Sequence, residues 1–283
     1  MSECSSHYKE MWAGAGSVQT NQPVAKGVRK ISLIAPEFAE RVKPGQFVML
    51  RLLEGSDPVL GRPFAVYDVE LETGRVDVIY AVVGKGTRRL AKLRVGDSVG
   101  LWGPLGNGWQ AAARLNPAKK VVLVAGGVGH APFYLEIKRI LALPEESRPE
   151  LTFVYGGRTR GRMSCVDEFQ ALGCDARFAT EDGSLGTKGF VTELLPTLFP
   201  EDFDPRDGQI LACGPGPMMR AVALWAQKRG IECWTSLESP MACGMGICYS
   251  CVVEWKQDDG TWDYRRTCVD GPVFDASRLN WNI

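Results

Sequence analysis

The sequence predicts an all-β domain, either a barrel or a sandwich, then an α/β domain with an open parallel sheet, then a small C-terminal module. Three observations predict this order. Short β-type segments separated by turns fill residues 19–115. Buried-strand patterns alternate with helical patterns over residues 116–232. Residues 233–283 are rich in cysteine and form the third part.

The first domain is expected to follow a loose leader formed by residues 1–18. Glycines recur between its short β-type segments, as they do at the turns of an all-β domain. The expected strands cover residues 28–33, 46–52, 76–83 and 98–102.

The second domain is expected from a change of period after residue 117. Residues 119–125 and 151–155 are almost wholly apolar, as buried parallel strands are. Residues 132–143 place their apolar side chains at helical spacing. The alternation continues through residues 176–179, 191–198, 209–213 and 218–229.

Composition excludes several classes of protein. The 283 residues contain 33 basic and 33 acidic side chains, so nothing favours binding to nucleic acid. No apolar run reaches the roughly 18 residues of a membrane helix, and no secretory signal is visible at the N-terminus. Nine cysteines without such a signal predict a reducing, cytoplasmic location in which clustered thiols bind metal.

The strongest motif is a group of four cysteines. Cys243, Cys248 and Cys251 have the spacing C-x4-C-x2-C, and Cys268 follows at a distance. This is the plant-type spacing for the ligands of a [2Fe–2S] cluster. A zinc site is the alternative, but zinc favours paired C-x2-C spacings, and Cys268 has no close partner.

Three glycine-bearing turns are expected to meet at one edge of the parallel sheet. Residues 125–132, 155–158 and 212–215 each follow a predicted buried strand. Ligands bind at the carboxyl ends of such strands, so the turns predict a nucleotide crevice. Arg158 is suited to a phosphate or ribose, although a solvated surface arginine is nearly as good an interpretation. His130 fits acid–base chemistry less well than simple packing.

Two motifs in the β domain are suited to a flavin nucleotide. Arg62 precedes Pro63, Phe64 and Ala65 between two β-type segments, and arginine can bind phosphate with two hydrogen bonds. Residues 83–87 are able to add backbone amides around a pyrophosphate. Each motif alone is also consistent with an ordinary surface arginine or glycine turn.

Taken together, the motifs resemble the ferredoxin-NADP reductase superfamily. The order of the motifs carries the resemblance: Arg62-Pro63-Phe64, Gly84-Lys85-Gly86-Thr87, residues 103–108, residues 126–129 and Cys213-Gly214-Pro215. Residues 236–248 and 268–274 narrow it, because they closely resemble electron-transfer subunits of type B dihydroorotate dehydrogenases. The resemblance covers about residues 22–281.

This resemblance implies a Greek-key FAD-binding barrel, an NAD-binding α/β domain and a [2Fe–2S] module. It also implies a partner, an FMN-containing dihydroorotate dehydrogenase catalytic subunit, in a heterotetramer. Electrons would then pass from the partner to the cluster, to FAD and finally to NAD⁺. A flavin suits this position, because it converts between single electrons and hydride.

The resemblance also assigns residues. Arg62 would contact an FAD phosphate, Phe64 the ring system, and Gly86 and Thr87 the pyrophosphate. Cys213 would lie at the reaction centre as the catalytic candidate, although a buried strand-end thiol is an alternative. The full cofactor-binding set is Arg62, Pro63, Phe64, Ala65, Val83, Gly86, Thr87, Gly126, Gly127, Gly129, Arg158 and Gly214, with Cys243, Cys248, Cys251 and Cys268 as cluster ligands.

Some features leave alternatives open. Ala65 stands where the family usually has Ser or Thr, and His130 replaces an apolar residue. One rival is an FAD and [2Fe–2S] subunit of an electron-bifurcating ferredoxin-NAD(P) oxidoreductase or sulfide dehydrogenase, although those proteins commonly have Asp at the position of Cys243. A non-catalytic redox sensor is another. The resemblance favours NAD, and Glu181 and Asp182 suit ribose hydroxyls, whereas nearby arginines would suit NADP.

Overall fold

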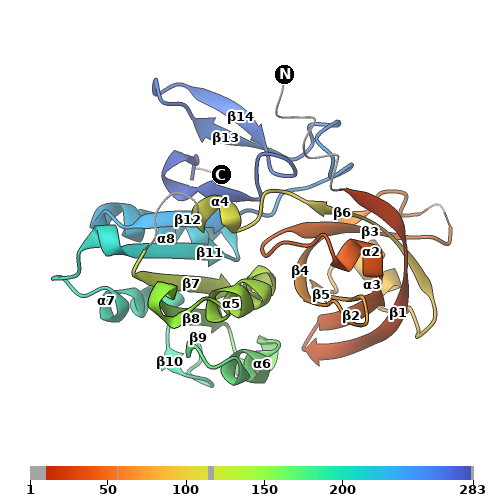
Figure 1. Ribbon diagram of the computed structural model, residues 1–283, viewed down its shortest axis with the longest axis horizontal. Coiled ribbons are helices and arrows are strands. Elements are labelled where there is room, and N and C mark those ends of the chain that lie inside the picture. The colour runs from red at the N-terminus through yellow and green to blue at the C-terminus, as the bar shows by residue number, and fades with distance from the viewer. Residues whose placement is uncertain (1–10, 56, 114–117, 282–283) are drawn as a thin grey trace.

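The computed structural model describes residues 11–55, 57–113 and 118–281. Figure 1 shows a β-barrel packed beside a layered α/β unit, with a two-stranded hairpin projecting from the C-terminal part. No helix among these described residues is both long and apolar enough to cross a membrane.

The barrel is closed and entirely antiparallel, with strand order β1-β2-β5-β4-β3-β6. This non-sequential order is that of a Greek key, as predicted. Alternate strand residues such as Ile31, Val48, Val76 and Val99 fill its interior. The strands are β1 (Trp12–Ala25), β2 (Val28–Ile34), β3 (Phe47–Leu52), β4 (Arg62–Glu70), β5 (Arg75–Ala81) and β6 (Ser98–Leu105).

The expectation of a loose leader is wrong for residues 12–18. Strand β1 begins at Trp12, and its first residues pair with β6 from Trp12 opposite Gly103 to Ser17 opposite Ser98. The segment lacks an alternating apolar pattern because one side of it faces solvent and small residues pack on the other. Residues 1–10 lie outside the described part.

The α/β unit has a seven-stranded sheet in the order β10-β9-β8-β7-β11-β12-β15, parallel except for β15. Helices cover both of its faces (Figure 1). Leu123 and Phe153 point towards the α5 and α6 side, whereas Val122 and Val124 point towards the α7 and α8 side. The strands are β7 (Lys120–Gly126), β8 (Glu150–Gly157), β9 (Asp175–Thr180), β10 (Thr187–Lys188), β11 (Gly208–Cys213), β12 (Glu232–Ser236) and β15 (Val273–Asp275).

Helices connect these strands, and one begins later than the sequence pattern indicates. The segment expected as a helix from residue 132 starts as the 3₁₀ turn η1, which precedes α5. The helices are α2 (Pro36–Ala39), α3 (Lys85–Leu90), α4 (Gln110–Ala113), α5 (Tyr134–Leu141), α6 (Val166–Ala171), α7 (Leu195–Leu198) and α8 (Gly216–Arg229). The 3₁₀ turns are η1 (Gly127–Phe133), η2 (Glu145–Ser147), η3 (Arg160–Arg162), η4 (Val191–Glu193), η5 (Pro205–Asp207) and η6 (Ala276–Arg278).

The C-terminal module is not separate from the sheet. β12 lies across the predicted division at 232/233, and β15 comes from inside the predicted module, yet both pair within the seven-stranded sheet. What projects beyond it is the hairpin of β13 (Val252–Lys256) and β14 (Trp262–Arg266) (Figure 1). The predicted division at 115/116 lies outside the described residues, and the three-domain division stays a prediction.

Barrel and α/β unit pack against each other through β4, β5, η1 and α5. Lys30 of β2 pairs with Glu168 of α6 at 2.8 Å, and Lys138 of α5 pairs with Asp68 of β4 at 2.6 Å. Tyr67 of β4 also donates a hydrogen bond to Glu168. These cross-links fix the barrel relative to the carboxyl ends of the parallel strands.

Candidate functional site

A cavity on the barrel brings together three of the residues predicted to bind FAD. Its lining combines apolar walls with two arginines: Leu50, Arg51, Leu52, Pro58, Leu60, Arg62, Phe64, Gly86 and Leu90. A Cβ atom added to Gly86 would lie 3.3 Å from Arg62 Nε, so this glycine lets α3 approach the guanidinium. An arginine beside apolar walls is the kind of group that binds a phosphate, so the binding of FAD here stays a prediction.

The start of α3 is shaped by Thr87. Its Oγ1 accepts hydrogen bonds from the backbone N–H groups of Val83 and Gly84, each at 3.0 Å. This closes the turn that faces the cavity, while the Val83 side chain is exposed. Thr87 therefore shapes the turn, and its contact with pyrophosphate stays a prediction.

Successive side chains along β4 point to opposite sides, so Phe64 and Ala65 contact different parts of the protein. Phe64 packs with the barrel interior, where its ring lies 5.8 Å from that of Tyr80. Ala65 packs against the core that includes Ala131 and Phe133 of the α/β unit. Ala65 therefore lies on the side of the barrel that faces the α/β unit, and its place beside a flavin stays a prediction.

The three glycine-bearing turns meet at one edge of the sheet, as predicted. β8, β7 and β11 are consecutive neighbours, and all three run parallel. A Cβ atom on Gly129 would lie 2.4 Å from Cys213 O, and one on Gly126 would lie 2.5 Å from Met218 Sδ. One on Gly214, whose φ is +158°, would lie 2.9 Å from Gly126 N. These three glycines are therefore needed for the turns to pack together.

Gly127 differs from its neighbours, because it is exposed and has open space beside its Cα. Its φ of +56° favours glycine. Within the turn it is the glycine best placed to present backbone to a dinucleotide.

The outer end of the crevice carries opposite charges. Arg158 is exposed after β8, and its carbonyl accepts a hydrogen bond from Asp182 N at 3.3 Å. Hydrogen bonds from the Ser184 side chain and backbone hold the pKa of Asp182 below its usual value. Arg160 is already paired with Asp167. An anionic Asp182 beside this turn favours ribose hydroxyls over a 2′-phosphate.

His130 is a packed, neutral residue. Its side chain is fully buried, Nδ1 lies 2.8 Å from Gly127 O, and Nε2 lies 3.2 Å from Ser164 Oγ. The imidazole stacks on Tyr155 at 4.9 Å. Burial lowers the pKa of His130 to about 4, so the ring is uncharged near neutral pH. These contacts favour packing over acid–base chemistry.

Cys213 ends β11 at the centre of the crevice. Burial, and then the negative charge of Glu238, raise the pKa of its thiol to about 12. The thiol stays protonated, so it does not supply a nucleophile. Ser236 lies opposite Cys213 across β11 and β12. The sequence analysis did not single out Ser236 and Glu238 as site residues. The signal was the parallel strand β12, which ends at Ser236 on this same edge of the sheet.

The four predicted ligand cysteines are brought together beneath the hairpin. Cys251 and Cys268 are each 2% exposed, Cys243 is half-buried and Cys248 is exposed. The Met245 N–H donates to Cys243 Sγ at 3.3 Å. Gly244 and Gly246 have φ of +71° and +78°, conformations that favour glycine and let the loop wrap tightly.

Hydrogen bonds within this loop favour the thiolate, the form that binds iron, at Cys248 and Cys251. Hydrogen bonds from the Ser250 side chain and backbone lower the pKa of Cys248 to about 6. A hydrogen bond with Cys268 lowers the pKa of Cys251 to about 6 and raises that of Cys268. Four thiols with backbone N–H donors around them suit a [2Fe–2S] cluster.

The described residues contain no group of three His, Cys, Asp or Glu side chains set around a single metal ion. A [2Fe–2S] cluster needs only two thiolates at each iron.

The cluster loop packs directly on the barrel. Cys251 and Cys268 share an apolar group with Phe47, Met49 and Leu105 of β3 and β6. Phe47 is the residue that pairs with Ala65 in the β3–β4 ladder. One strand therefore separates the ligand cysteines from the face of β4 expected beside the flavin.

A flavin-type barrel, a dinucleotide sheet and a four-cysteine loop together define an electron-transfer reductase with the ferredoxin-NADP reductase fold. Residues 123–224 match the model of the oxidoreductase NAD-binding domain. Residues 238–280 match the model of the iron–sulfur cluster binding domain of dihydroorotate dehydrogenase B.

Curated relatives identify the family. The chain is 34% identical over 264 residues to the dihydroorotate dehydrogenase B (NAD(+)) electron transfer subunit of Fusobacterium nucleatum, covering 92% of this chain and 96% of that protein. It is 36% identical over 263 residues to the subunit of the same name from Bacillus velezensis, covering 93% and 97%. The chain belongs to the family of dihydroorotate dehydrogenase B electron transfer subunits.

Solved structures agree with the fold. An NADH-dependent reduced ferredoxin-NADP oxidoreductase superimposes with a TM-score of 0.80 at 32% identity, covering 94% of this chain and 90% of that chain. A ferredoxin NADP⁺ reductase from Neisseria gonorrhoeae with bound FAD and NADP has a TM-score of 0.65 at 20% identity, covering 77% and 92%. The predicted fold and the predicted cofactors, FAD, a [2Fe–2S] cluster and NAD, are confirmed at the level of the family.

Proposed function

We propose that this chain passes electrons from an FMN-containing dihydroorotate dehydrogenase catalytic subunit, through a [2Fe–2S] cluster and FAD, to NAD⁺. The single observation that carries the proposal is the short connection through β3. Phe47 pairs with Ala65 on the flavin strand and packs with the ligand cysteines Cys251 and Cys268. This connection supports a path on which the proposed cluster and flavin sites are neighbours in one fold.

The chain's own residues bind and orient the cofactors. Bound FAD exchanges hydride with NAD, and a [2Fe–2S] cluster moves single electrons. Arg62 offers its guanidinium to a phosphate of FAD, and the Val83–Thr87 turn encloses the pyrophosphate. Gly127 presents backbone to the dinucleotide, and Cys213 holds a protonated, half-buried thiol at the reaction centre. Hydride transfer requires no general acid or base from the protein.

Ala65 offers no hydroxyl where the family usually has Ser or Thr. Its side chain faces the α/β unit, so only the backbone of β4 is left to hydrogen-bond a flavin at this point. Ala65 therefore does not remove a binding element from the proposed site.

The proposed partner surface lies at the hairpin end. Cys248 is the exposed ligand, and the exposed side chains of Ile247 and Tyr249 flank it. An exposed ligand with apolar neighbours suits a partner that brings its own cofactor close to the cluster. Membership of a family of electron transfer subunits supports such a partner, and we propose a cytoplasmic heterotetramer.

A second candidate is a subunit of an electron-bifurcating ferredoxin-NAD(P) oxidoreductase. The 0.80 TM-score to the NADH-dependent reduced ferredoxin-NADP oxidoreductase favours it. Cys243 favours the dihydroorotate function, because the bifurcating proteins commonly have Asp there.

The test uses the chain co-expressed with its catalytic subunit and purified without oxygen. Dihydroorotate-dependent reduction of NAD⁺ is expected only when both chains are present. Activity with reduced ferredoxin and NADPH, and none with dihydroorotate, would contradict the proposal and favour the bifurcating alternative. The catalytic subunit alone with an artificial acceptor is the control.

A further inference from the structure

One tryptophan touches both the cluster loop and the flavin strand. Trp102 of β6 donates a hydrogen bond from Nε1 to the carbonyl oxygen of Cys243 at 3.0 Å. Cys243 is the first of the four ligand cysteines, and its Sγ also accepts the Met245 N–H. The barrel therefore holds the backbone of a cluster ligand directly.

The far edge of the same indole lies against the start of β4. A Cβ atom added to Gly61 would lie 2.4 Å from Trp102 Cη2 and 3.1 Å from Cζ3. Gly61 is buried and directly precedes Arg62, the predicted phosphate-binding residue. A ring that reaches this far leaves no room for a side chain at Gly61.

Strand register places these groups in one row. Met49 of β3 pairs with Trp102 on one side and with Pro63 of β4 on the other. A Cβ atom on Gly244 of the cluster loop would lie 2.7 Å from Met49 Cγ. The cluster loop thus packs against Met49 as well as against the indole of Trp102. Both residues belong to barrel strands, and Met49 pairs directly with β4.

We propose that Trp102 is a positioning residue that fixes the cluster loop relative to the flavin strand, through its N–H at Cys243 and its ring edge at Gly61. The proposal rests on the proposed function for the identity of the two cofactors. A rigid indole with one donor suits this task, because a ligand held loosely by even about 1 Å loses rate.

Trp109 provides a matched control. It lies in the segment that follows β6, and its Nε1, like that of Trp102, donates to a backbone carbonyl, that of Pro132, at 2.9 Å. Its ring stacks on Phe133 and does not belong to the apolar group around the ligand cysteines. Trp102→Phe therefore removes an indole hydrogen bond beside the cysteine loop, and Trp109→Phe removes the same kind of hydrogen bond away from it.

The experiment compares the holoprotein with both variants. We expect Trp102→Phe to change the electron paramagnetic resonance spectrum of the dithionite-reduced cluster. We also expect it to slow reduction of the cluster by NADH by about tenfold or more, while flavin reduction by NADH stays within about twofold. Trp109→Phe is expected to leave both cluster readouts unchanged. An unchanged spectrum and cluster-reduction rate in Trp102→Phe would overturn the proposal.

Gly61→Ala tests the other end of the ring. Its Cβ must displace the indole, so we expect a changed cluster spectrum although the substitution lies on the flavin strand. A wild-type spectrum in this variant would overturn the link through the ring. Loss of iron in Trp102→Phe with unchanged thermal unfolding would support the positioning role. If NADH fails to reduce the wild-type flavin, the proposed function fails, and the dithionite spectra still test Trp102.

Discussion

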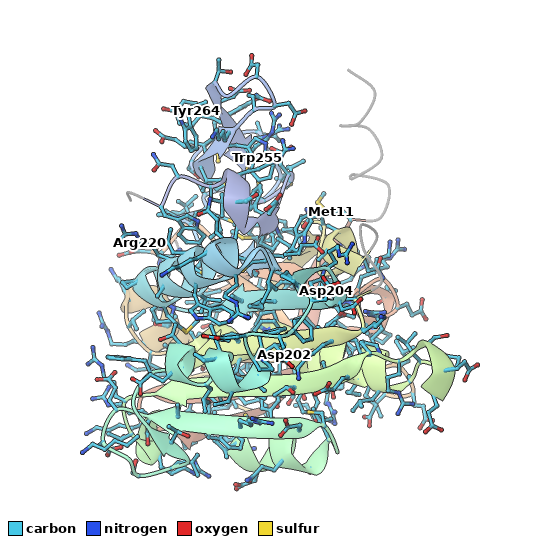
Figure 2. The ribbon with its side chains drawn as sticks, turned by 90° about the vertical axis from the view of Figure 1, so that its left-hand side faces the viewer. Met11, Asp202, Asp204, Arg220, Trp255 and Tyr264 are labelled. Atoms are coloured by element: carbon cyan, nitrogen blue, oxygen red, sulfur yellow. The ribbon has the colours of Figure 1, made fainter. Side chains whose placement is uncertain are left out.

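The barrel interface and the cysteine loop are held together in different ways. At the interface between barrel and α/β unit, Tyr67 stacks on Tyr134 at 4.4 Å and the pair Lys30–Glu168 connects the two domains. The cysteine loop instead depends on glycines with positive φ and on four thiols. Figure 2 shows its hairpin, with Trp255 and Tyr264, projecting beyond the sheet. The proposed nucleotide sites are therefore built on a packed core, whereas the cysteine loop is expected to need iron for its stability.

The largest expected effect is on the cysteine loop. Cys268→Ala removes a buried ligand, so iron should fall from about two atoms per chain to near zero. FAD binding should persist, because the barrel core does not depend on the cluster. Iron analysis and the visible spectrum measure both. Cys174→Ser is the control, because Cys174 has no ligand spacing. Loss of FAD together with iron would contradict the separation of the two regions.

The next largest effect is expected in the barrel. Arg62→Ala removes from the cavity the arginine that is predicted to bind phosphate, so FAD affinity should fall by about 10- to 100-fold, the range for hydrogen bonds to charged groups. Fluorescence titration of the apoprotein measures it. Arg88→Ala on α3 is the matched control, because Arg88 is exposed and does not line the cavity. Equal FAD affinity in both variants would show that Arg62 has no phosphate to bind.

A smaller effect is expected at the interface. Burial raises the pKa of Glu168, but hydrogen bonds and charge from Lys30, with Tyr67, outweigh it and leave the pKa below the usual 4.5. Glu168→Gln should therefore lower the free energy of unfolding by about 1 kcal/mol at pH 7, since the pair is partly solvent-screened.

The sign of the pH dependence follows from the lowered pKa. The contribution of Glu168 is fully present above its unfolded pKa and is lost as the pH falls through its folded pKa. Wild type and Glu168→Gln should converge in denaturant melts once the pH falls below the lowered pKa of folded Glu168. Asp167→Asn, next along the chain and exposed, should show almost no difference. A gap that persists in acid would contradict the ion pair as its cause.

The smallest effect is expected at the outer crevice. Asp182→Asn removes the anion beside Arg158, so the ratio of kcat/KM for NADPH to that for NADH should rise a few-fold. Steady-state reduction of an artificial acceptor by each nucleotide measures the ratio. Asp204→Asn is the control, because Asp204 (labelled in Figure 2) precedes β11, whereas Asp182 follows the parallel strand β9 at the opposite edge of the sheet. A fall in the ratio would show that Asp182 does not face the ribose.

The sequence predicted the parallel sheet well, because buried strands leave a strong local pattern. The cysteine spacing predicted the cluster-binding module that the family match confirms, whereas the role of each cysteine as a ligand stays a prediction. It did not predict β1 before residue 19, since the segment Trp12–Gly16 consists mostly of glycine and alanine and gains its pairing only from distant β6. It also missed Ser236, Glu238 and the contact of Trp102 with Cys243. These features arise where segments that are far apart in the sequence meet in the fold, and the spacing of residues in a sequence does not predict such contacts.

Stopped-flow mixing of the oxygen-free holoprotein with NADH tests the central claim, that flavin and cluster form one electron path, most directly. The account predicts that the flavin bands bleach first, and that the broad iron–sulfur absorbance then decreases as the cluster becomes reduced. Bleaching of the flavin alone, with the cluster staying oxidised and still reducible by dithionite, would contradict the account.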